Sequence, residues 1–382
     1  MTSKERFMNL LHGHSIDTMP VSPFIHKNFI YEVFDIDADQ TEGFDVVQKC
    51  IELNEKFGFD IMHRSAHLNF EADENTEVSS EDGKWRVHTE EISQDDSISE
   101  ITTIHTPKRI LRQIKETRKM NKYMRVSAVR EYFIKDKEDF EQFIEYQPPL
   151  RQIDTSNITR AFDLMGDKGI VIGHSYGIFN YLNNYRNLED LLMDPLLDEG
   201  FYREMVAYFM ERLSASQSQM MDAGTQIINF AMNIASAGTV SSQFFRDFIM
   251  EYEAELMQRV KKRGGYTFVH NCGDAKRLLP VYNEMPIDIY ESLTHPPFGD
   301  TVLEEALAIL RKDIVLCGNL DQIDFLVKAT PEEVYNETKR VVLQAKDRGR
   351  FILGTSDFFT NYTPYENIQA FVAAGREFGR YQ

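Results

Sequence analysis

The clearest pattern along the chain is the alternation of short apolar runs with amphipathic stretches, which begins near residue 160. Continuous apolar runs between helical stretches indicate strands that are buried on both faces, as in a parallel sheet. The predicted strands are Gly169–His174, Gln226–Ala231, Tyr266–His270, Ile287–Glu291, Asp313–Cys317 and Arg350–Gly354. The predicted helices between and after them are Asn187–Ala223, Ser241–Arg263, Ala275–Asn283, Thr301–Arg311, Pro331–Asp347 and Pro364–Gly379.

Two further strands are available upstream, at Met19–Ile25 and Phe59–Arg64, around a predicted helix at Phe44–Phe57. Eight strand units favour a closed (β/α)8 barrel over an open doubly wound sheet. No glycine-rich dinucleotide fingerprint follows the first strand, which argues against a Rossmann fold. Two helix starts have independent support, because Pro331 and Pro364 follow Thr330 and Thr363, which we expect to be N-caps.

The segment 66–150 does not follow this alternation of strands and helices. Asp82-Gly83, next to the alternating run Lys84–Thr89, predicts a β-hairpin, and an acidic stretch (Glu91–Glu100) and a basic stretch (Lys108–Lys122) follow it. The run Glu71–Glu77 is expected to be a solvated loop. We therefore expect a single barrel over residues 1–382, with 66–150 as an insertion that caps its mouth.

Composition narrows the class of protein. The chain has 42 basic and 61 acidic residues, a net charge of −19, which argues against non-specific binding to nucleic acid or to an anionic membrane. No apolar run approaches the roughly 20 residues of a membrane helix, and the N-terminal stretch is not a secretory signal. Three cysteines (Cys50, Cys272 and Cys317) provide no disulfide framework, so we expect a reducing, cytoplasmic location.

Polar residues gather where the predicted strands end, and this is the edge at which barrel enzymes hold their active sites. The sharpest pair is His270 and Cys272, because side chains two positions apart on a strand point the same way and zinc favours nitrogen and sulfur ligands. Cys317 is a candidate third ligand and Glu291 a fourth. The other polar residues at strand ends are His174, Asn229, Asn233, Asn319, Ser356 and Asp357.

Ordinary structural roles compete with these assignments. A free cysteine is most often a small buried hydrophobe, which favours core packing for Cys317 in its apolar strand and for Cys50 in its helix. His174 is equally compatible with a bond to a backbone carbonyl. His295 precedes the rigid turn Pro296–Asp300, a candidate pocket rim, and Asp300 is expected to be the N-cap of the next helix.

Several segments, in their order along the chain, resemble the uroporphyrinogen decarboxylase superfamily. They are Lys4–Gly13, Ile16–Val21, Gly173–Pro195, His270–Gly273, Cys317–Asp321 and Thr363–Ile368. This superfamily includes cobalamin-dependent methyltransferases as well as decarboxylases. The resemblance implies a distorted (β/α)8 barrel with a cleft at the carboxyl ends of the strands.

The resemblance is greater to the methyltransferase branch. The decarboxylases follow the first strand with arginines that hold porphyrinogen carboxylates, and Pro20–Asn28 has none. In the methyltransferase branch a His-x-Cys pair and a distant cysteine bind zinc, which activates a thiol that takes a methyl group from a corrinoid protein. This chain has Gly354–Asp357 where that cysteine belongs, so either Cys317 or Asp357 replaces it, or the site is not a zinc–thiol site. An oxygen ligand would suit an acceptor such as a folate.

The leading hypothesis is a zinc-dependent methyltransferase that works with methylcobalamin on a partner corrinoid protein and a small methyl donor or acceptor. The resemblance also implies a homodimer. One rival is a metal-free decarboxylase with Lys27, Arg64 and Arg130 as its candidate cations, and another is a non-catalytic barrel that binds a tetrapyrrole or corrinoid. The expected metal ligands are His270, Cys272 and Cys317, the catalytic residues Glu291, Asn233, His174 and Asp357, and the cofactor contacts Asn319, Tyr176 and Phe358.

Overall fold

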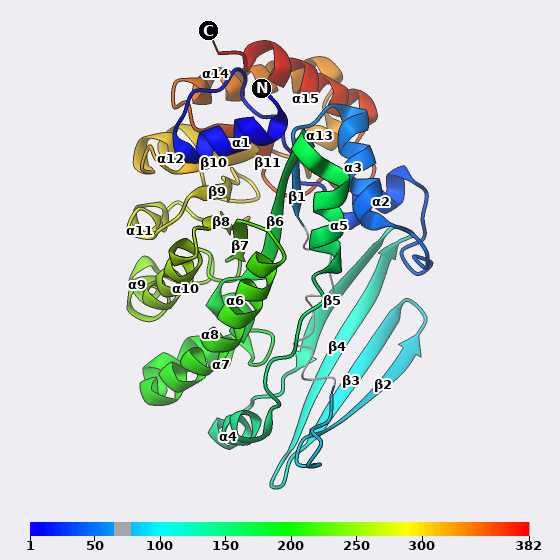
Figure 1. Cartoon of the computed structure of the whole chain (residues 1–382), viewed down its shortest axis with the longest axis vertical. Helices are drawn as coiled ribbons and strands as arrows, with labels where there is room; N and C mark the ends of the chain where they lie inside the picture. The colour runs from blue at the N-terminus through cyan, green and yellow to red at the C-terminus, as the bar shows by residue number, and fades with distance from the viewer. Residues whose placement is uncertain (65–77, 382) are drawn as a thin grey trace.

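A curled sheet of seven parallel strands forms the centre of the molecule (Figure 1). The computed structural model describes residues 1–64 and 78–381, and the predicted loop Glu71–Glu77 lies outside them. Neighbouring strands follow the order β1-β6-β7-β8-β9-β10-β11, which confirms the α/β class and the parallel sheet. The strands are β1 (Ile61–Arg64), β6 (Gly169–Tyr176), β7 (Ile227–Ala231), β8 (Tyr266–His270), β9 (Ile289–Ser292), β10 (Val315–Leu320) and β11 (Phe351–Thr355).

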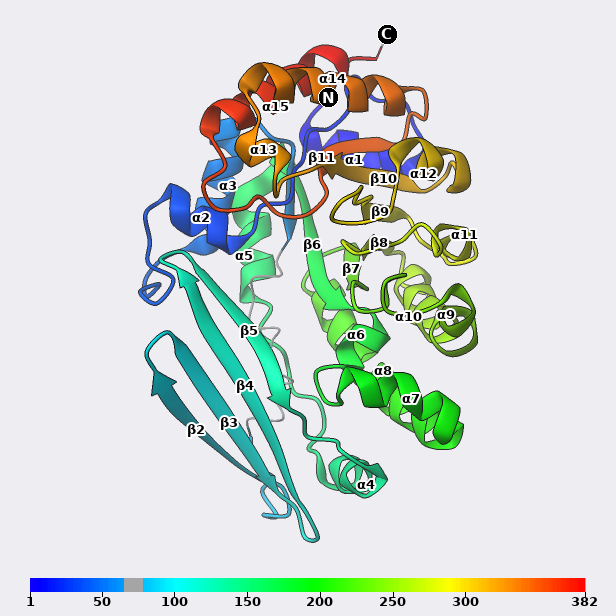
Figure 2. The same cartoon turned by 180° about the vertical axis from the view of Figure 1, so that it is seen from behind.

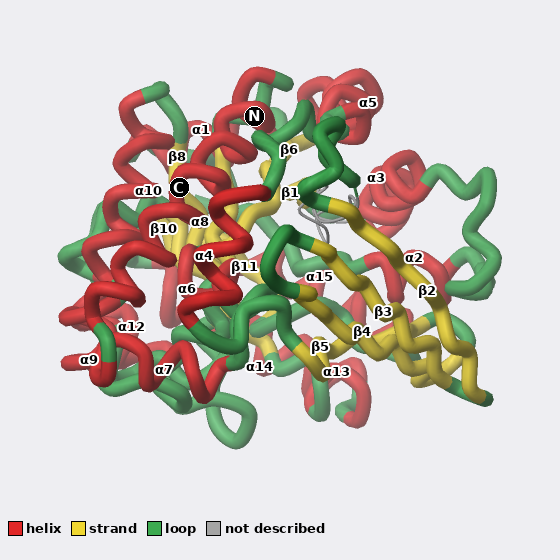
Figure 3. The backbone as a smooth tube through the Cα atoms, turned by 90° about the horizontal axis from the view of Figure 1, so that it is seen from below, coloured by secondary structure: helices red, strands yellow, loops and turns green. Residues whose placement is uncertain are grey.

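Helices lie around the parallel sheet, as the view from below in Figure 3 shows. Those before β7 are α1 (Ser3–His12), α2 (Lys27–Val33), α3 (Val46–Phe57), α4 (Lys137–Tyr146), α5 (Ser156–Met165), the 3-10 helix Gly166–Lys168, α6 (Ile178–Leu182), α7 (Leu188–Leu197) and α8 (Glu199–Asp222). Those after it are α9 (Ser242–Phe248), α10 (Met250–Lys262), α11 (Leu279–Tyr282), α12 (Leu303–Ile309), α13 (Phe325–Lys328), α14 (Pro331–Lys346) and α15 (Tyr365–Phe378).

The inner face of the sheet is built in layers, because alternate residues of a strand point to the same side. Near the amino ends of the strands the inner side chains are apolar, and Phe7 and Leu10 of α1 pack against them. One step further along, the inner positions become polar. The apolar layer includes Met62, Ile172, Ile227, Phe268, Ile289, Val315 and Ile352, and the polar layer above it contains Arg64, His174, Asn229, His270 and Glu291. Because of this alternation, a cluster of polar side chains lies at the carboxyl ends of the strands.

The expected eighth strand, Met19–Ile25, is present only as a short bridge. Val21 forms an isolated parallel bridge with Leu353 of β11, supported by a bond of 2.8 Å from Ser22 N to Leu353 O. On its other side, Asp60 N donates to Val21 O at 2.8 Å, directly before β1. The segment thus links both edge strands of the sheet, but the two prolines that flank it, Pro20 and Pro23, have no N–H to extend a ladder.

Residues Arg86 to Glu131 form a separate antiparallel sheet of four strands, in the order β2-β3-β4-β5. It lies on the opposite side of the molecule from α9 and α10 (Figures 1 and 2). Its apolar residues Ile104 and Leu111 join the same buried cluster as the outer face of the parallel sheet. The strands are β2 (Arg86–Gln94), β3 (Ser97–His105), β4 (Ile110–Asn121) and β5 (Met124–Glu131).

A turn is present at Asp82-Gly83 and β2 follows it, but most of the segment that would form the other strand of a hairpin lies outside the described residues. Ser80 and Trp85 bond to each other across that turn. Trp85 N donates to Ser80 Oγ at 3.0 Å, and Ser80 N donates to Trp85 O at 2.7 Å. The hairpin that follows turns at Asp95-Asp96, between β2 and β3. The acidic stretch covers the end of β2, this turn and the start of β3, and most of the basic stretch forms β4. Strands β3 and β4 pair, for example with Glu100 opposite Lys115.

Several predicted helices have different limits in the structure. The segment Asn187–Ala223 is divided at Asp198, whose carboxylate accepts from Phe201 N at 3.0 Å and so caps α8. The segment Ser241–Arg263 is likewise divided at Ile249. The helix start at Pro331 is confirmed, with Thr330 as its N-cap. Helix α15 instead has Pro364 as its N-cap residue, and the hydroxyl of Thr363, the expected N-cap, donates to Thr360 O. In the described parts of the chain, every helix is too short or too polar to cross a membrane.

Candidate metal centre

Three side chains from two distant parts of the chain converge at the carboxyl edge of the parallel sheet. His270 is the last residue of β8, Cys272 follows it by two positions, and Asp357 lies just after β11. One ligand atom from each lies within 4.8 Å of the others, and His270 Nε2 is 4.0 Å from Asp357 Oδ1. One nitrogen, one sulfur and one oxygen donor form a donor set that suits a zinc ion.

Glu291 fixes the orientation of the His270 ring. Its Oε2 is 2.7 Å from His270 Nδ1, which leaves Nε2 directed toward Cys272 and Asp357. Arg64, at the end of β1, donates to both oxygens of the same carboxylate, with 2.6 Å from Nη1 to Oε2. A carboxylate that holds the second ring nitrogen is the usual support of a histidine ligand.

The charges of this group depend on one another because all of its members are buried. Burial raises the pKa of Glu291, but the charge of Arg64 and the bond to His270 prevail and lower it to about 2. Burial lowers the pKa of His270, yet the bonds to Cys272 and Glu291 raise it well above its ordinary value. Glu291 is therefore ionised at neutral pH, and a metal cation at Nε2 would take the place of a proton on the ring.

An aromatic wall lies beside the three candidate ligands. It consists of Phe24 and His26, which follow the short bridge at Val21, and of Phe358, which follows Asp357. The ring of Phe24 is 5.9 Å from those of both His270 and Phe358, and His26 lies 4.7 Å from Phe358. The guanidinium of Arg64 stacks 3.7 Å from the centre of the Phe24 ring. This side of the site is therefore largely apolar.

Four of the other predicted residues lie around this group. His174 Nδ1 is 2.9 Å from Asn229 Nδ2 on the neighbouring strand, and the Tyr176 ring is 5.6 Å from that of His174. Asn319 is buried at the end of β10, where its amide donates to Leu293 O. Asn233, by contrast, is exposed beyond the end of β7 and bonds to Asn180.

Cys317 lies outside the group of three candidate ligands. It is fully buried in the inner apolar layer, and its thiol donates to Glu291 Oε1 across 3.7 Å. Burial, followed by the charge of Glu291, raises the pKa of this thiol well above its usual range. Both oxygens of Glu291 are engaged in hydrogen bonds, with Arg64, His270 and Cys317 as partners. The remaining cysteine, Cys50, is buried in α3 as expected.

The expected role of Asp300 as a helix N-cap is wrong. Helix α12 begins only at Leu303, with Val302 as its N-cap residue. The Asp300 carboxylate instead accepts from the backbone of Ala275 and Lys276, at 2.7 and 2.9 Å. It therefore ties the loop after β9 to the segment that follows Cys272. His295 is engaged in its own turn, with Nδ1 2.7 Å from Pro296 O.

Phe24 and His26 were not predicted as parts of this site, and Arg64 was predicted only as a candidate cation of a decarboxylase. A signal was present for Arg64, because it is a charged residue at the carboxyl end of a strand. Its alternation with Met62 places it on the inner face. The signal for Phe24 and His26 is weaker, since their place beside His270 depends on a long-range contact between the chain near its start and the loop after β11.

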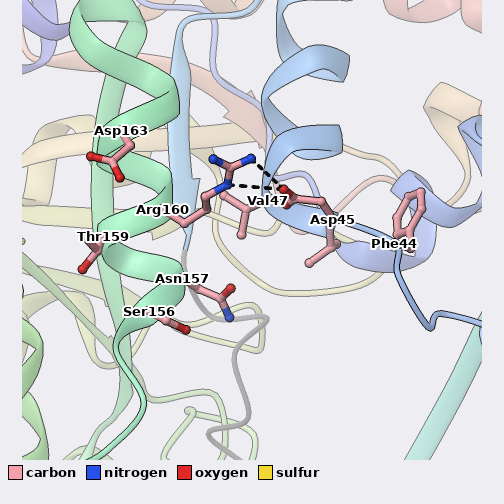
Figure 4. Close-up of a pocket in the computed structure, with 9 residues that line it drawn as sticks. Phe44, Asp45, Val47, Ser156, Asn157, Thr159, Arg160 and Asp163 are labelled. Carbon is pink, nitrogen blue, oxygen red and sulfur yellow. Dashed lines mark hydrogen bonds and ion pairs between the residues drawn. The ribbon is translucent and has the colours of Figure 1, made fainter.

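A cleft lies on the outer side of the molecule, between α3 and α5 (Figure 4). Arg160 of α5 bridges it to Asp45, the N-cap of α3, at 3.0 Å. Its described lining contains no histidine or cysteine.

The fold and these residues define a class of α/β protein with a candidate metal site at the carboxyl edge of its parallel strands. The sequence profile of the uroporphyrinogen decarboxylase family matches residues 122–378, and the chain belongs to this family.

Relatives of known name are methyltransferases of Methanosarcina mazei. The chain is 30% identical over 154 residues to a methylated-thiol–coenzyme M methyltransferase, an alignment that covers 40% of this chain and 38% of that protein. It is 21% identical over 255 residues to the methylcobamide:CoM methyltransferase MtbA, covering 66% of this chain and 71% of the relative.

Solved structures share the fold. A methyltransferase from Methanosarcina mazei superposes with a TM-score of 0.73 at 16% identity, over 99% of each chain. A B12-independent methionine synthase from Shewanella superposes with a TM-score of 0.50 at 13% identity, over 94% of this chain and 97% of that one.

Proposed function

We propose that this protein is a zinc-dependent methyltransferase that moves a methyl group between a corrinoid on a partner protein and a small thiol, folate or methylated substrate. The observation that carries the proposal is the convergence of His270, Cys272 and Asp357 within 4.8 Å. The names of the relatives support the same type of reaction, since they are methyltransferases for methylated thiols and methylcobamides.

In this proposal zinc is held by His270 Nε2, Cys272 Sγ and a carboxylate oxygen of Asp357. These donors fit zinc, which accepts nitrogen, sulfur and oxygen and keeps an open position in catalytic sites. When bound, the metal supplies Lewis acidity that lowers the pKa of a coordinated thiol or polarises another acceptor. One thiolate and one carboxylate balance the charge of the ion, so Asp357 replaces a second cysteine without a change in net charge.

The residues around the ligands have separate tasks. Glu291 keeps His270 Nδ1 occupied and so presents Nε2 to the metal. Arg64 holds Glu291 in place and keeps it ionised. Phe24 and Phe358 provide an apolar wall that excludes water from one side of the site. A thiolate or a methyl group is less solvated there than in water, which favours nucleophilic displacement.

A porphyrinogen-type decarboxylase is less compatible with this arrangement. Such an enzyme needs cations to bind the carboxylates of its substrate. Of the candidates, Arg64 is buried against Glu291, and Arg130 is bonded to Glu116 in the four-stranded sheet. This leaves Lys27, at the start of α2, as the remaining candidate of the three.

The decisive experiment measures metal and methyl transfer together. Wild type, Cys272→Ala and Cys50→Ala are purified, their zinc content is determined by mass spectrometry, and transfer is followed from free methylcobalamin to a thiol by absorbance. We expect about one zinc per chain in wild type and Cys50→Ala, and both metal and transfer to be lost in Cys272→Ala. Zinc retained in Cys272→Ala, or transfer that is unaffected by its loss, would refute the proposal.

A further inference from the structure

His174 and Asn229 form a second polar feature of the site, separate from the proposed metal ligands. They lie opposite each other in the register of β6 and β7, on the inner face of the sheet. His174 Nδ1 and Asn229 Nδ2 are 2.9 Å apart. Because an amide NH2 only donates, Nδ1 of His174 is the acceptor and its ring proton is on Nε2.

The His174 ring is neutral as well as oriented. Burial lowers its pKa to about 3, helped by the positive charges of His270, Arg64 and His26. It therefore presents one N–H donor at Nε2, for which residues 1–64 and 78–381 provide no partner.

Asn229 contributes an unused acceptor. The residue is 2% exposed, and its Oδ1 is a buried atom without a hydrogen-bond partner among the described residues. Leaving such an atom unpaired in a folded protein is costly, by about 1–3 kcal/mol. The pair thus offers a donor and a buried, unpaired acceptor on the same inner wall.

The nearby guanidinium is not available to bind a charged partner, because Arg64 is engaged by both oxygens of Glu291. A sulfonate or carboxylate only accepts hydrogen bonds, so it leaves Asn229 Oδ1 unpaired and adds a buried charge. A hydroxyl group can accept from His174 and donate to Asn229.

We propose that His174 and Asn229 form a subsite for an uncharged hydroxyl group of the substrate, whose reacting atom lies toward His270, Cys272 and Asp357. This inference rests on the proposed function, because it concerns the substrate of that same site. His174 is then a specificity-determining residue that positions the substrate, and the metal ligands are independent of it.

The test uses three thiols of similar size as probes: 2-mercaptoethanol, 2-mercaptoethanesulfonate and ethanethiol. Their binding to the cobalt(II)-substituted protein is followed through the sulfur-to-metal absorption band. We expect wild type to bind 2-mercaptoethanol about tenfold more tightly than either other thiol, as one or two net hydrogen bonds allow. In His174→Phe this preference should disappear, while affinity for ethanethiol and metal content remain unchanged.

His88→Phe, the same substitution at an exposed position of β2, is the matched control and should behave as wild type. Asn229→Leu should lose part of the preference. Equal binding of the three thiols by wild type, tighter binding of the sulfonate, or a preference that survives in His174→Phe would overturn the subsite.

A metal-free measurement separates this inference from the proposed function. Nitrogen-15 NMR of histidine-labelled apoprotein should show His174 protonated at Nε2, and its signal should shift with 2-mercaptoethanol but not with ethanethiol. If the protein binds no metal but shows these shifts, the proposed function fails and the subsite stands. If the metal binds and the His174 signal does not respond, the subsite fails alone.

Discussion

The two sheets of this protein use ion pairs in opposite ways. In the parallel sheet, Arg64 and Glu291 are 4% and 1% exposed, and they meet between β1 and β9 beneath the candidate metal centre. In the four-stranded sheet, Arg112 and Glu131 pair across β4 and β5 with side chains that are 40% and 27% exposed. The chemical groups are the same, but their environments differ.

This difference determines what each pair contributes. Water screens the exposed pair, and such pairs are worth little when measured one at a time. The buried pair has lost its hydration, so each charge depends on the other and on His270. The role that we assign to the buried pair is therefore to orient His270, and not only to add stability. Identical substitutions in the two sheets can test this.

The largest expected effect is that of Arg64→Met. Glu291 would remain buried without its main counter-charge, and breaking a buried pair from one side typically costs about 3–5 kcal/mol. Urea unfolding at pH 7 measures this cost. The double variant Arg64→Met/Glu291→Leu removes both charges and should recover a large part of the lost stability. If Arg64→Met were as stable as wild type, the buried charge of Glu291 would not depend on Arg64.

The same pair has a predicted pH dependence. The folded-state pKa of Glu291 is about 2, below its ordinary value of 4.5, so the folded state favours the ionised form. Its contribution to stability is complete above pH 4.5 and is lost as the pH falls toward 2. Unfolding of wild type and Glu291→Leu between pH 6 and pH 2.5 should therefore converge in acid. Parallel curves would contradict the assignment.

The next effect in size concerns metal affinity. Glu291→Gln keeps the shape of the side chain but weakens its hold on His270 Nδ1. Loss of such a supporting carboxylate lowers metal affinity by about 10–100-fold. Competition with a chromogenic chelator measures the change, and Glu131→Gln in the other sheet provides the matched control. Equal affinity in wild type and Glu291→Gln would remove Glu291 from the metal site.

The sequence predicted the parallel strands well because their signal is local. The strand Tyr266–His270 was predicted with the bounds that it has in the structure, and the spacing of His270 and Cys272 indicated a shared site. Asp357 was an open alternative to Cys317, and the structure favours Asp357. To choose between these two residues one must know which of them lies beside the end of β8, and no local sequence pattern contains that information.

The four-stranded sheet was harder to predict for a physical reason. Asp82-Gly83 has the composition of a hairpin turn. In the structure, however, the Ser80 hydroxyl oxygen accepts a hydrogen bond from Trp85 N across this turn, and the Trp85 side chain is buried. The hairpin turn at Asp95-Asp96 lies inside an acidic stretch that looks like a solvated loop. Cross-strand pairs such as Glu100 with Lys115 neutralise these charges only after the sheet has formed.

The smallest expected effect is that of Arg112→Met, the substitution that matches Arg64→Met. We expect less than about 1 kcal/mol of lost stability, because the pair with Glu131 is exposed and Lys135 remains 2.6 Å from the same carboxylate. Metal content should not change. Mass spectrometry checks the metal content. Urea unfolding in low and high salt checks the stability, since screening should reduce the small difference further. A loss as large as that in Arg64→Met would mean that burial is not what distinguishes the two sheets, and that the charge of the four-stranded sheet has a structural role that its exposure does not suggest.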